Sequence, residues 1–488
     1  MARYSRRRFL EDSLLTAAAA VTAGSATRVF GQGAESKSPN ERLAVAVVGA
    51  GGRGGDHIRA MLGRSDVEIT YIVDADETHG QKQCENIGKK QSRTPKFVRD
   101  MREAFDDPAL DIVTTATPNH WHALVSIWAM QAGKDMYVEK PVSHNVSEGR
   151  RMVETARKHN RICQTGTQCR SMKGSIDAIE YIKAGKIGEV KLARGLCYKR
   201  RTSIGPKGEY EVPKEVDYNL WSGPAPILPL TRPRFHYDWH WQRPYGNGDQ
   251  GNQGPHQMDI CRWGLGMDRI ADSVISYGGR LGYEDAGDTA NTQVSVYEFK
   301  PEGKTIVFEV RGLETPDLKG AKVGVIFYGS EGYVVLNSYT AGAAFDMDGK
   351  MIEKFQGGGD DAHYDNFIRA VRSRNYEDLN ADILQGHLSC ALSHLGNMSY
   401  YLGQQASVDD IRAALGKLQT NEDPAETLDR TVEHLKENGV DLAKTPLVLG
   451  PQLAVDSQAE TVTNNEAAVP MLTREYRAPF IVPASGEV

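Results

Sequence analysis

The sequence lacks several features that would mark particular classes of protein. It has only six cysteines in 488 residues, and no two of them form a C-x-x-C pair. A chain so poor in cysteine is not a disulfide-rich scaffold. No internal run of apolar residues approaches the length that a membrane span requires, so we expect no stable membrane insertion.

An excess of positive charge is also absent. The chain carries 58 basic and 64 acidic side chains, a formal net charge of −6. This balance gives no electrostatic reason to expect nucleic acid or an anionic membrane surface as a partner. What remains is the composition of an ordinary globular protein, with 40% hydrophobic and 25% charged residues, in a chain long enough for two or three domains.

Residues 1–34 differ in composition from the rest of the chain. A basic start is followed by Leu, Ala and Val and then by small residues suited to cleavage, which is the order of an export signal. Residues 5–10, SRRRFL, resemble a twin-arginine signal in particular. An amphipathic first helix is the alternative interpretation. We expect the twin-arginine export machinery to carry the protein to the periplasm or otherwise out of the cytoplasm. Because that route transports folded proteins, the cysteines should be mostly buried free thiols.

A glycine motif between a predicted strand and a predicted helix is the most informative pattern in the chain. Residues 43–48 are apolar, the next six satisfy G-x-G-x-x-G, and a helical pattern follows. A second predicted strand ends in Asp74, 20 residues beyond Gly54. This order is typical of a Rossmann-like dinucleotide-binding domain. A glycine-rich connector in another parallel α/β domain is the alternative.

The residues of this motif have defined roles in such a domain. Gly49 permits the turn, Gly51 lets the backbone approach the pyrophosphate, and the helix N-terminus offers free N–H groups. Asp74 is placed to hold the ribose hydroxyls. Because its carboxylate would repel a 2′-phosphate, the sequence favours NAD over NADP, and Arg53 would weaken that preference.

Two later strands are predicted to end at the same edge of the sheet. The first precedes Thr117, Pro118 and Asn119, and the second precedes Glu139 and Lys140. The carboxyl ends of parallel strands are where such folds bind ligands. Surface charge at a strand end is the simpler interpretation of the Glu-Lys pair, whereas a functional lysine is the more specific one.

At these motifs the sequence resembles the glucose–fructose oxidoreductase, inositol dehydrogenase and MocA (Gfo/Idh/MocA) superfamily. The stretches VAVVGAGGRG, TPNHWH, EKP and GKIGEV carry the resemblance, which spans about residues 43–400. It implies that Lys140 is catalytic, lying against the substrate carbinol and the nicotinamide, and that His122 lies beside the cofactor. The predicted NAD contacts are Gly49, Gly51, Gly52, Arg53, Gly54, Asp74, Thr117, Pro118, Asn119, His122, Glu139, Lys140 and Gln168.

A second domain follows the predicted Rossmann domain, which spans residues 41–165. At residues 166–400, five or more strand-like stretches in meander order predict an α+β domain with an open, mainly antiparallel sheet. Residues 401–488 are predicted to form C-terminal helices and a wrapping tail. The expected fold class is therefore an α/β Rossmann-like N-terminal domain plus this α+β domain, and we expect a homo-oligomer assembled through the second sheet.

The stretch GNQGPHQMDICRW contains a second catalytic candidate. Gly254 and Pro255 suit a helix start, which places His256 in the first turn. Members of the resembling family usually carry Asp-x-x-x-His here, whereas this chain has Asn252 at the first position. His256 can still accept a hydroxyl proton near neutral pH, and Asn252 can orient the hydroxyl without taking its proton. A helix-capping histidine is the simpler interpretation.

Aromatic and histidine clusters leave further alternatives open. Four of the six tryptophans lie within residues 221–263, either as core or as a carbohydrate platform. The predicted substrate contacts are Arg170, Trp239, His240, Trp241 and Asp259. The pairs His120/His122 and His236/His240 lack a third ligand at a recognisable spacing, so we predict no metal.

The resemblance implies an NAD-dependent oxidoreductase acting on a hydroxyl of a sugar, cyclitol or glycoside. The same residues would also suit a glycosidase that works by oxidation, elimination, water addition and re-reduction. A non-catalytic sugar-binding protein is the third interpretation. Since an exported enzyme meets no cytoplasmic NAD pool, we expect NAD to stay bound through the catalytic cycle.

Overall fold

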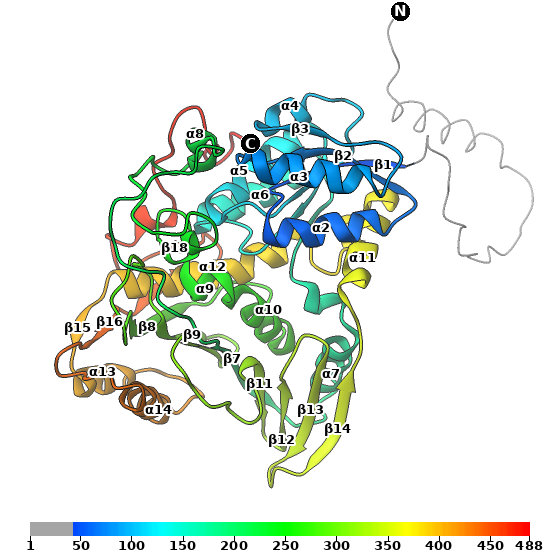
Figure 1. Cartoon of the computed structure of the whole chain (residues 1–488). Coiled ribbons are helices and arrows are strands. Elements are labelled where there is room, and N and C mark those ends of the chain that lie inside the picture. The colour runs from blue at the N-terminus through cyan, green and yellow to red at the C-terminus, as the bar shows by residue number, and fades with distance from the viewer. Residues whose placement is uncertain (1–41) are drawn as a thin grey trace, which may run out of the picture.

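The computed structural model of the protein describes residues 42–488, so the predicted signal lies outside the described residues. Two sheets organise the described part, one in each half of the molecule (Figure 1). This arrangement is the fold class that the sequence predicts, a parallel-sheet domain followed by a domain with a mostly antiparallel sheet.

The first sheet has six parallel strands in the order β3-β2-β1-β4-β5-β6. The strands are β1 (Leu43–Val48), β2 (Val67–Val73), β3 (Lys96–Val98), β4 (Ile112–Thr115), β5 (Asp135–Val138) and β6 (Cys163–Thr165). Val45 and Val47 of β1 belong to one core cluster, whereas Ala46 and Val48 belong to another. Because alternate side chains point to opposite faces, both faces of β1 are buried, as in other parallel sheets.

Helices cover both faces of this sheet. On one side lie α2 (Gly52–Leu62), α3 (Glu77–Gly88) and α11 (Asp360–Ser373). On the other lie α4 (Met101–Phe105), α5 (Asn119–Gln131) and α6 (Val146–Lys158). Helix α5 is apolar nearly all round and buried along most of its length, as expected for a helix inside the protein.

The second sheet has twelve strands, most of them in the order β14-β13-β12-β11-β7-β10-β9-β8-β16-β15. They are β7 (Val190–Tyr198), β8 (Ser273–Gly279), β9 (Thr292–Phe299), β10 (Lys304–Arg311), β11 (Val323–Gly329), β12 (Gly332–Leu336), β13 (Ala341–Asp346), β14 (Met351–Gln356), β15 (Gln404–Ala406), β16 (Leu447–Leu449), β17 (Leu453–Asp456) and β18 (Thr461–Val462). The predicted meander is wrong at one place, because β7 lies between β10 and β11 and pairs with β10 in parallel. Its residues from Leu192 to Tyr198 are all buried, which suits a central position.

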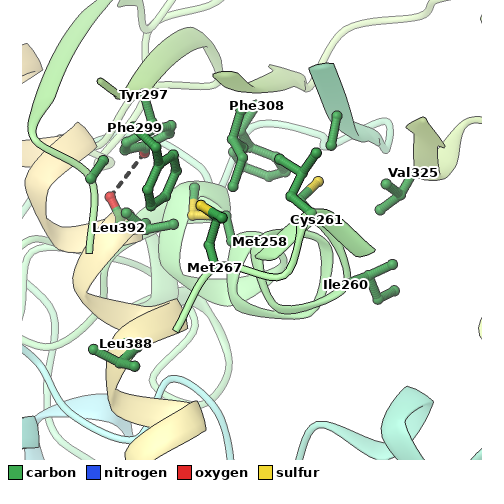
Figure 2. Close-up of a cluster of buried hydrophobic side chains, with 14 of the residues drawn as sticks. Met258, Ile260, Cys261, Met267, Tyr297, Phe299, Phe308, Val325, Leu388 and Leu392 are labelled. Atoms are coloured by element: carbon green, nitrogen blue, oxygen red, sulfur yellow. Dashed lines mark hydrogen bonds between the residues drawn. The ribbon is translucent and has the colours of Figure 1, made fainter. Parts of the chain in front are cut away.

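Two long helices pack on one face of the second sheet, α10 (Gly254–Leu265) and α12 (Ile383–Tyr401). Figure 2 shows Met258 and Cys261 of α10 close to Phe308, and Leu392 of α12 close to Tyr297. The Tyr297 hydroxyl donates to the Leu392 carbonyl at 2.9 Å. The opposite face, predicted open, is partly covered by α13 (Val408–Leu415) and α14 (Pro424–Glu437).

The remaining elements are short or connect the two domains. They are α7 (Lys173–Lys183), α8 (Tyr218–Ser222), α9 (Gly248–Asn252), and the 3₁₀ turns η1 (Gln168–Ser171), η2 (Asp238–Trp241), η3 (Tyr376–Asp378) and η4 (Val469–Leu472). All six cysteines are buried and free, so the prediction of buried thiols is confirmed. Within residues 42–488 no helix is long and apolar enough to cross a membrane.

Residues 199–247, here called the strap, leave the second domain after β7 and reach the first. The Asp217 N–H donates to the Ala75 carbonyl at 2.9 Å, and the Glu77 N–H donates to the Glu215 carbonyl at 3.1 Å. Between these bonds, Asp76 and Val216 form a β-bridge. The strap is therefore joined by backbone to the loop between β2 and α3.

The last residues of the chain return to the first domain, where the C-terminus is seen in Figure 1. Phe480 is buried, with its ring centroid 5.4 Å from that of Trp121 and 6.3 Å from that of Trp128 on α5. Arg477 donates to the side-chain and backbone oxygens of Asn219 in α8, at 2.7 and 2.8 Å. The tail thus holds the strap against α5.

Candidate active site

A cavity of about 700 Å³ opens between the two domains, a volume within the usual range for small-molecule sites. Strand-end loops of the first sheet form one side, and the strap, α9, α10 and Tyr339 form the other. Of the predicted cofactor residues, all except Gly54 line it: Gly49, Gly51, Gly52, Arg53, Asp74, Thr117, Pro118, Asn119, His122, Glu139, Lys140 and Gln168.

The glycine loop needs glycine at its first and last positions for steric reasons. Gly49 has a φ of +81°, and a Cβ there would lie 2.8 Å from the Thr117 nitrogen. A Cβ on Gly54 would lie 1.9 Å from the Gly49 carbonyl oxygen. Gly54 therefore lets α2 pack against the turn rather than lining the cavity.

The N-terminus of α2 is open toward a ligand. Gly51, its N-cap, has no side chain to accept from the first amides, and the first turn carries no acidic residue. A Cβ on Gly52 would meet nothing within 4 Å. Free N–H groups beside open space, at the positive end of a helix, are what a pyrophosphate requires.

Asp74 lies at the end of β2 and is held by two backbone amides. Its carboxylate accepts from the Ala50 N–H at 2.8 Å and from the Asp76 N–H at 2.9 Å. Burial raises the pKa of this carboxyl, although the two amides oppose the shift. The group is rigidly placed in the same cavity as the glycine loop, where ribose hydroxyls would reach it.

Glu139 is the centre of a buried polar cluster beneath the cavity. Its Oε1 accepts from Arg53 Nε at 2.8 Å and meets His57 Nε2 at 3.2 Å and Gln168 Nε2 at 3.4 Å. Burial alone would raise its pKa, but Arg53 and His57 outweigh that effect and hold the pKa well below its usual range. Glu139 thus stays ionised, and it is the nearest carboxylate along the chain to Lys140.

Lys140 points from the end of β5 toward the second domain. Its Nζ donates to the Asn252 backbone oxygen at 2.7 Å and lies 3.4 Å from the Asn252 Oδ1. Burial lowers the pKa of Lys140, the Glu139 charge opposes the shift, and Arg53 adds to it. The ammonium group is therefore held by neutral oxygens and can release a proton more readily than an exposed lysine.

His256 lies in the first turn of α10 and lines the same cavity. It is 6% exposed, and its buried Nδ1 has no hydrogen-bond partner among residues 42–488. Burial and the charge of Lys140 lower its pKa well below the usual value, so the imidazole is neutral at pH 7. Its ring lies 4.8 Å from that of Tyr339. A neutral imidazole has one nitrogen free to accept a proton.

His122 joins two strand-end loops. Its Nδ1 lies 2.5 Å from the Pro141 carbonyl and its Nε2 lies 2.8 Å from the Thr117 carbonyl. Asn119 is linked across the domains, because its Nδ2 donates to Asn247 Oδ1 at 3.2 Å. Both side chains line the cavity, and their contacts fix the loops that carry Thr117 and Lys140.

The predicted substrate residues fall into two groups. Trp239 and His240 line the cavity and stack on each other with ring centroids 3.6 Å apart. Trp241 does not line it, and its ring packs under Arg201 at 5.2 Å. The reason is local: η2 turns the chain, so neighbouring tryptophans point to different sides.

Arg170 and Asp259 also lie away from the cavity lining, contrary to the prediction of sugar contact. Arg170 Nε and Nη2 donate to the two Asp259 oxygens at 2.7 and 2.9 Å. Ser389 Oγ donates to Asp259 Oδ1 at 2.9 Å. A bidentate buried ion pair satisfies the hydrogen-bonding groups of both side chains. The pair therefore joins η1 to α10 and does not face a ligand.

Several cavity residues carried no sequence signal. Tyr339 follows β12, Gln253 precedes α10, and Asp360 begins α11, all without a motif. The Gln253 Nε2 donates to the Tyr339 hydroxyl at 2.6 Å. Tyr237 and His79 also line the cavity. Only the fold brings these distant positions together, although the strap's aromatic content was a partial signal.

A Rossmann domain whose glycine loop, acidic strand end and lysine share one cavity defines a dinucleotide-binding protein. The chain belongs to the Gfo/Idh/MocA family of oxidoreductases. The model of the family's NAD-binding Rossmann fold matches residues 43–167, and the model of its C-terminal alpha/beta domain matches residues 196–434.

Curated relatives match the chain only in part. A levoglucosan dehydrogenase of Pseudarthrobacter phenanthrenivorans is 28% identical over 36% of this chain and 38% of its own length. An inositol 2-dehydrogenase of Salmonella typhimurium is 27% identical over 36% of this chain and 50% of its own length. An alpha-N-acetylgalactosaminidase of Shewanella oneidensis is 27% identical over 38% of this chain and 44% of its own length. The chain thus spans half the length of these relatives or less.

Solved structures agree with the fold over a longer span. Levoglucosan dehydrogenase in complex with NADH and levoglucosan aligns with a TM-score of 0.56 at 18% identity, covering 73% of this chain and 96% of that one. An aldose-aldose oxidoreductase from Caulobacter crescentus complexed with glycerol gives 0.55 at 16% identity, covering 73% and 97%. These likenesses establish the two-domain fold.

Proposed function

We propose that the protein is an NAD-dependent oxidoreductase acting on a hydroxyl of a sugar, cyclitol or glycoside. The observation that carries the proposal is the convergence of Lys140, Asn252 and His256 in the cavity that also contains the glycine loop and Asp74. NAD, when bound, accepts a hydride from the carbinol carbon and returns it in the reverse direction. The family and the substrates named for its relatives support a sugar or cyclitol.

The protein's own residues would then manage the proton and the geometry. His256 accepts the hydroxyl proton, because its imidazole is neutral at pH 7 and lines the same cavity as Lys140. The Lys140 ammonium donates to the carbinol oxygen as negative charge develops there. Asn252 keeps the Lys140 Nζ in place, and Trp239 offers an aromatic face to the C–H surface of a sugar.

The preference for NAD over NADP is part of the proposal. It is supported by Asp74, whose carboxylate is fixed by two amides at the ribose end of the cavity. A 2′-phosphate beside this group would be repelled.

We further propose that NAD stays bound through the cycle. The strap crosses the cavity and is joined to the β2–α3 loop, and the C-terminal tail braces it through Arg477 and Phe480. Release of a dinucleotide would therefore require the strap to open. Retention suits an exported protein, and export by the twin-arginine route, which carries folded and loaded proteins, is our proposal for its localisation.

Retention also favours a second candidate, a redox-neutral glycosidase. One relative is named an alpha-N-acetylgalactosaminidase, and a cofactor that cannot leave must be regenerated on the same substrate or on a second one. In that case the same His256 and Lys140 would handle protons at successive steps.

One experiment separates these functions. The protein is purified without added cofactor, and its ultraviolet spectrum and native mass report bound NAD(H). It is then mixed with aryl glycosides and with free sugars. Phenol release without net NADH identifies the glycosidase, and NADH formation or oxidation of bound cofactor identifies the oxidoreductase. Binding without any chemistry would favour a sugar-binding protein, and a protein that neither carries nor binds NAD would contradict the proposal.

We also propose a homo-oligomer formed through the second sheet. In the described part of the chain its edge strand β14 pairs with β13 alone, and Met351 and Ile352 on it are 54% and 50% exposed. Exposed apolar residues on an edge strand favour association. Light scattering of the eluting protein tests this, and a mass of one chain at micromolar concentration contradicts it.

A further inference from the structure

Three side chains that take no part in the proposed hydride chemistry meet beside Asp74. Asp76 caps α3, His79 lies in the first turn of the same helix, and His236 comes from the strap. One ligand atom from each lies within 4.8 Å of the others. Sequence spacing does not predict this cluster, because His236 lies 157 positions beyond His79 and only the fold brings the two together.

The Asp76 carboxylate is divided between two tasks. Its Oδ1 accepts from the His79 backbone N–H at 3.1 Å and caps the helix. Its Oδ2 lies 3.0 Å from His236 Nε2 and 3.8 Å from His79 Nδ1. One oxygen is therefore committed to the backbone, and the other faces both imidazoles.

These separations fit a tetrahedral metal site. Ligand oxygens and nitrogens lie about 2.0–2.2 Å from a zinc ion, which places them roughly 3.3–3.6 Å apart. The two measured separations, 3.0 and 3.8 Å, lie on either side of that interval.

The local charge also favours a cation. Asp74 and Asp76 are neighbours, and among residues 42–488 neither has an ion pair with a lysine or arginine. Arg99, which lines the cavity nearby, is paired with Glu77.

An ion can reach the cluster. The side chain of Asp76 is 8% exposed, whereas those of His79 and His236 are 39% and 45% exposed. Three protein ligands are enough for such a site, because a water molecule or a small molecule in the cavity can occupy the fourth coordination position of the ion.

We propose that Asp76, His79 and His236 bind one divalent transition-metal ion, with zinc the best match to two imidazoles and a carboxylate. The ion joins the strap to the β2–α3 loop at the ribose end of the cavity. Since the strap and the loop already share backbone hydrogen bonds at Ala75 and Glu77, the ion tightens an existing junction. The site stands apart from the hydride chemistry proposed above.

The test measures binding of Zn²⁺ alone to the full chain after removal of metal with a chelator. Calorimetry should give one ion per chain, and Co²⁺ should give the visible absorption of a four-coordinate site. His236→Ala and His79→Ala should each weaken Zn²⁺ binding at least about tenfold. Asp76→Asn keeps the helix cap, since asparagine caps as well as aspartate, and should weaken binding similarly.

A histidine far from the cluster provides the control for this test. His159→Ala, at the end of α6 and outside the cavity, should bind Zn²⁺ like the original chain. Hydrogen exchange of the Glu77 and Asp217 amides should slow when Zn²⁺ is added. If the original chain and His236→Ala bind Zn²⁺ equally, or if Co²⁺ shows only the weak visible absorption of its hexaaqua ion, the site is a hydrogen-bonded contact only. If Zn²⁺ binds but the two amides exchange as before, the joining role is wrong.

Discussion

At the scale of single residues, Lys140 is unusual in having its hydrogen bonds accepted by neutral oxygens while a carboxylate stands one residue away. The Nζ donates to Asn252 at 2.7 Å, whereas Glu139 is engaged by Arg53 and His57. An aspartate at position 252, as the family usually has, would instead give the lysine a charged partner. In this chain, burial therefore lowers the pKa of Lys140.

Replacing Lys140 tests whether the lysine is catalytic. Lys140→Ala should reduce turnover by about 10²-fold or more, because it removes the donor to the developing oxyanion. Bound NAD should remain, since the glycine loop and Asp74 are untouched. Steady-state rates and the absorbance of bound cofactor provide the two readings. Activity at the original level in Lys140→Ala would contradict the assigned role.

The change Asn252→Asp tests the electrostatics of the same pair. A carboxylate within hydrogen-bonding distance favours the charged lysine and should raise the pKa of Lys140 by about one unit or more. If the ammonium form is the active one, activity falls as pH rises through this pKa, so the alkaline limb of kcat/KM should move to higher pH. Asn252→Ala is the control, because it removes the amide without adding charge. An alkaline limb that does not move in Asn252→Asp would mean that another group titrates there.

The sequence predicted most of the cofactor side of this site and less of the substrate side. The motifs around Gly49, Asp74 and Lys140 are local, so strand-end placement alone brings them to one edge. Trp241 and Arg170 were misplaced because their direction depends on η2 and on a partner 89 positions away. Tyr339 was missed because only the second sheet brings it near His256.

At the scale of elements, the strap and the tail form one unit across the cavity. Trp121 of α5 donates through its indole nitrogen to the Leu220 carbonyl at 2.9 Å, so α5 holds α8 from one side. The tail holds it from the other side through Arg477. The strap has no sheet of its own, and contacts from α5 and from the tail hold it near its middle, at Asn219 and Leu220.

Removing one aromatic ring from the tail tests this bracing. Phe480→Ala should lower the free energy of unfolding by about 3–5 kcal/mol, because Phe480 is 2% exposed among the tryptophans of α5. It should also speed the dissociation of NAD. Ile481→Ala is a matched control, since its neighbouring side chain is 53% exposed and should change little. Thermal denaturation and stopped-flow cofactor release measure both effects, and an unchanged release rate in Phe480→Ala would contradict the bracing.

Element order was predictable where periodicity was strong, and element placement was not. Strands β7–β12 of the second sheet were recognised from their alternating or buried patterns, whereas β13–β18 were not. The position of β7 between β10 and β11 depends on which strand edges are free when the later strands form. The sequence of a strand that is buried on both faces does not indicate which strands pair with it. The sequence also did not predict that α13 and α14 cover the second sheet, because the pattern of an amphipathic helix does not specify which sheet face it packs against.

At the scale of the whole molecule, the expected export of the protein depends on residues that lie before the described part. Arg6→Lys with Arg7→Lys should keep the protein in the cytoplasm, because the twin-arginine pair is what that machinery recognises. Arg28→Lys is the control outside the motif. Fractionation with an antibody against the protein measures the outcome. Export of the double variant at the original level would contradict the proposed route.

The position of the tail has a consequence for the order of events during synthesis. The glycine loop, Asp74 and Lys140 leave the ribosome before the strap, which begins 59 residues after Lys140, and Phe480 comes near the end of the chain. Domains fold as they emerge, from the N-terminus onward. The nucleotide half of the site is thus complete while the side that covers it is still unbraced. With the retention and export proposed above, loading of cofactor is expected in that interval. The nucleotide supply of the compartment of synthesis should then set how much of the protein is active.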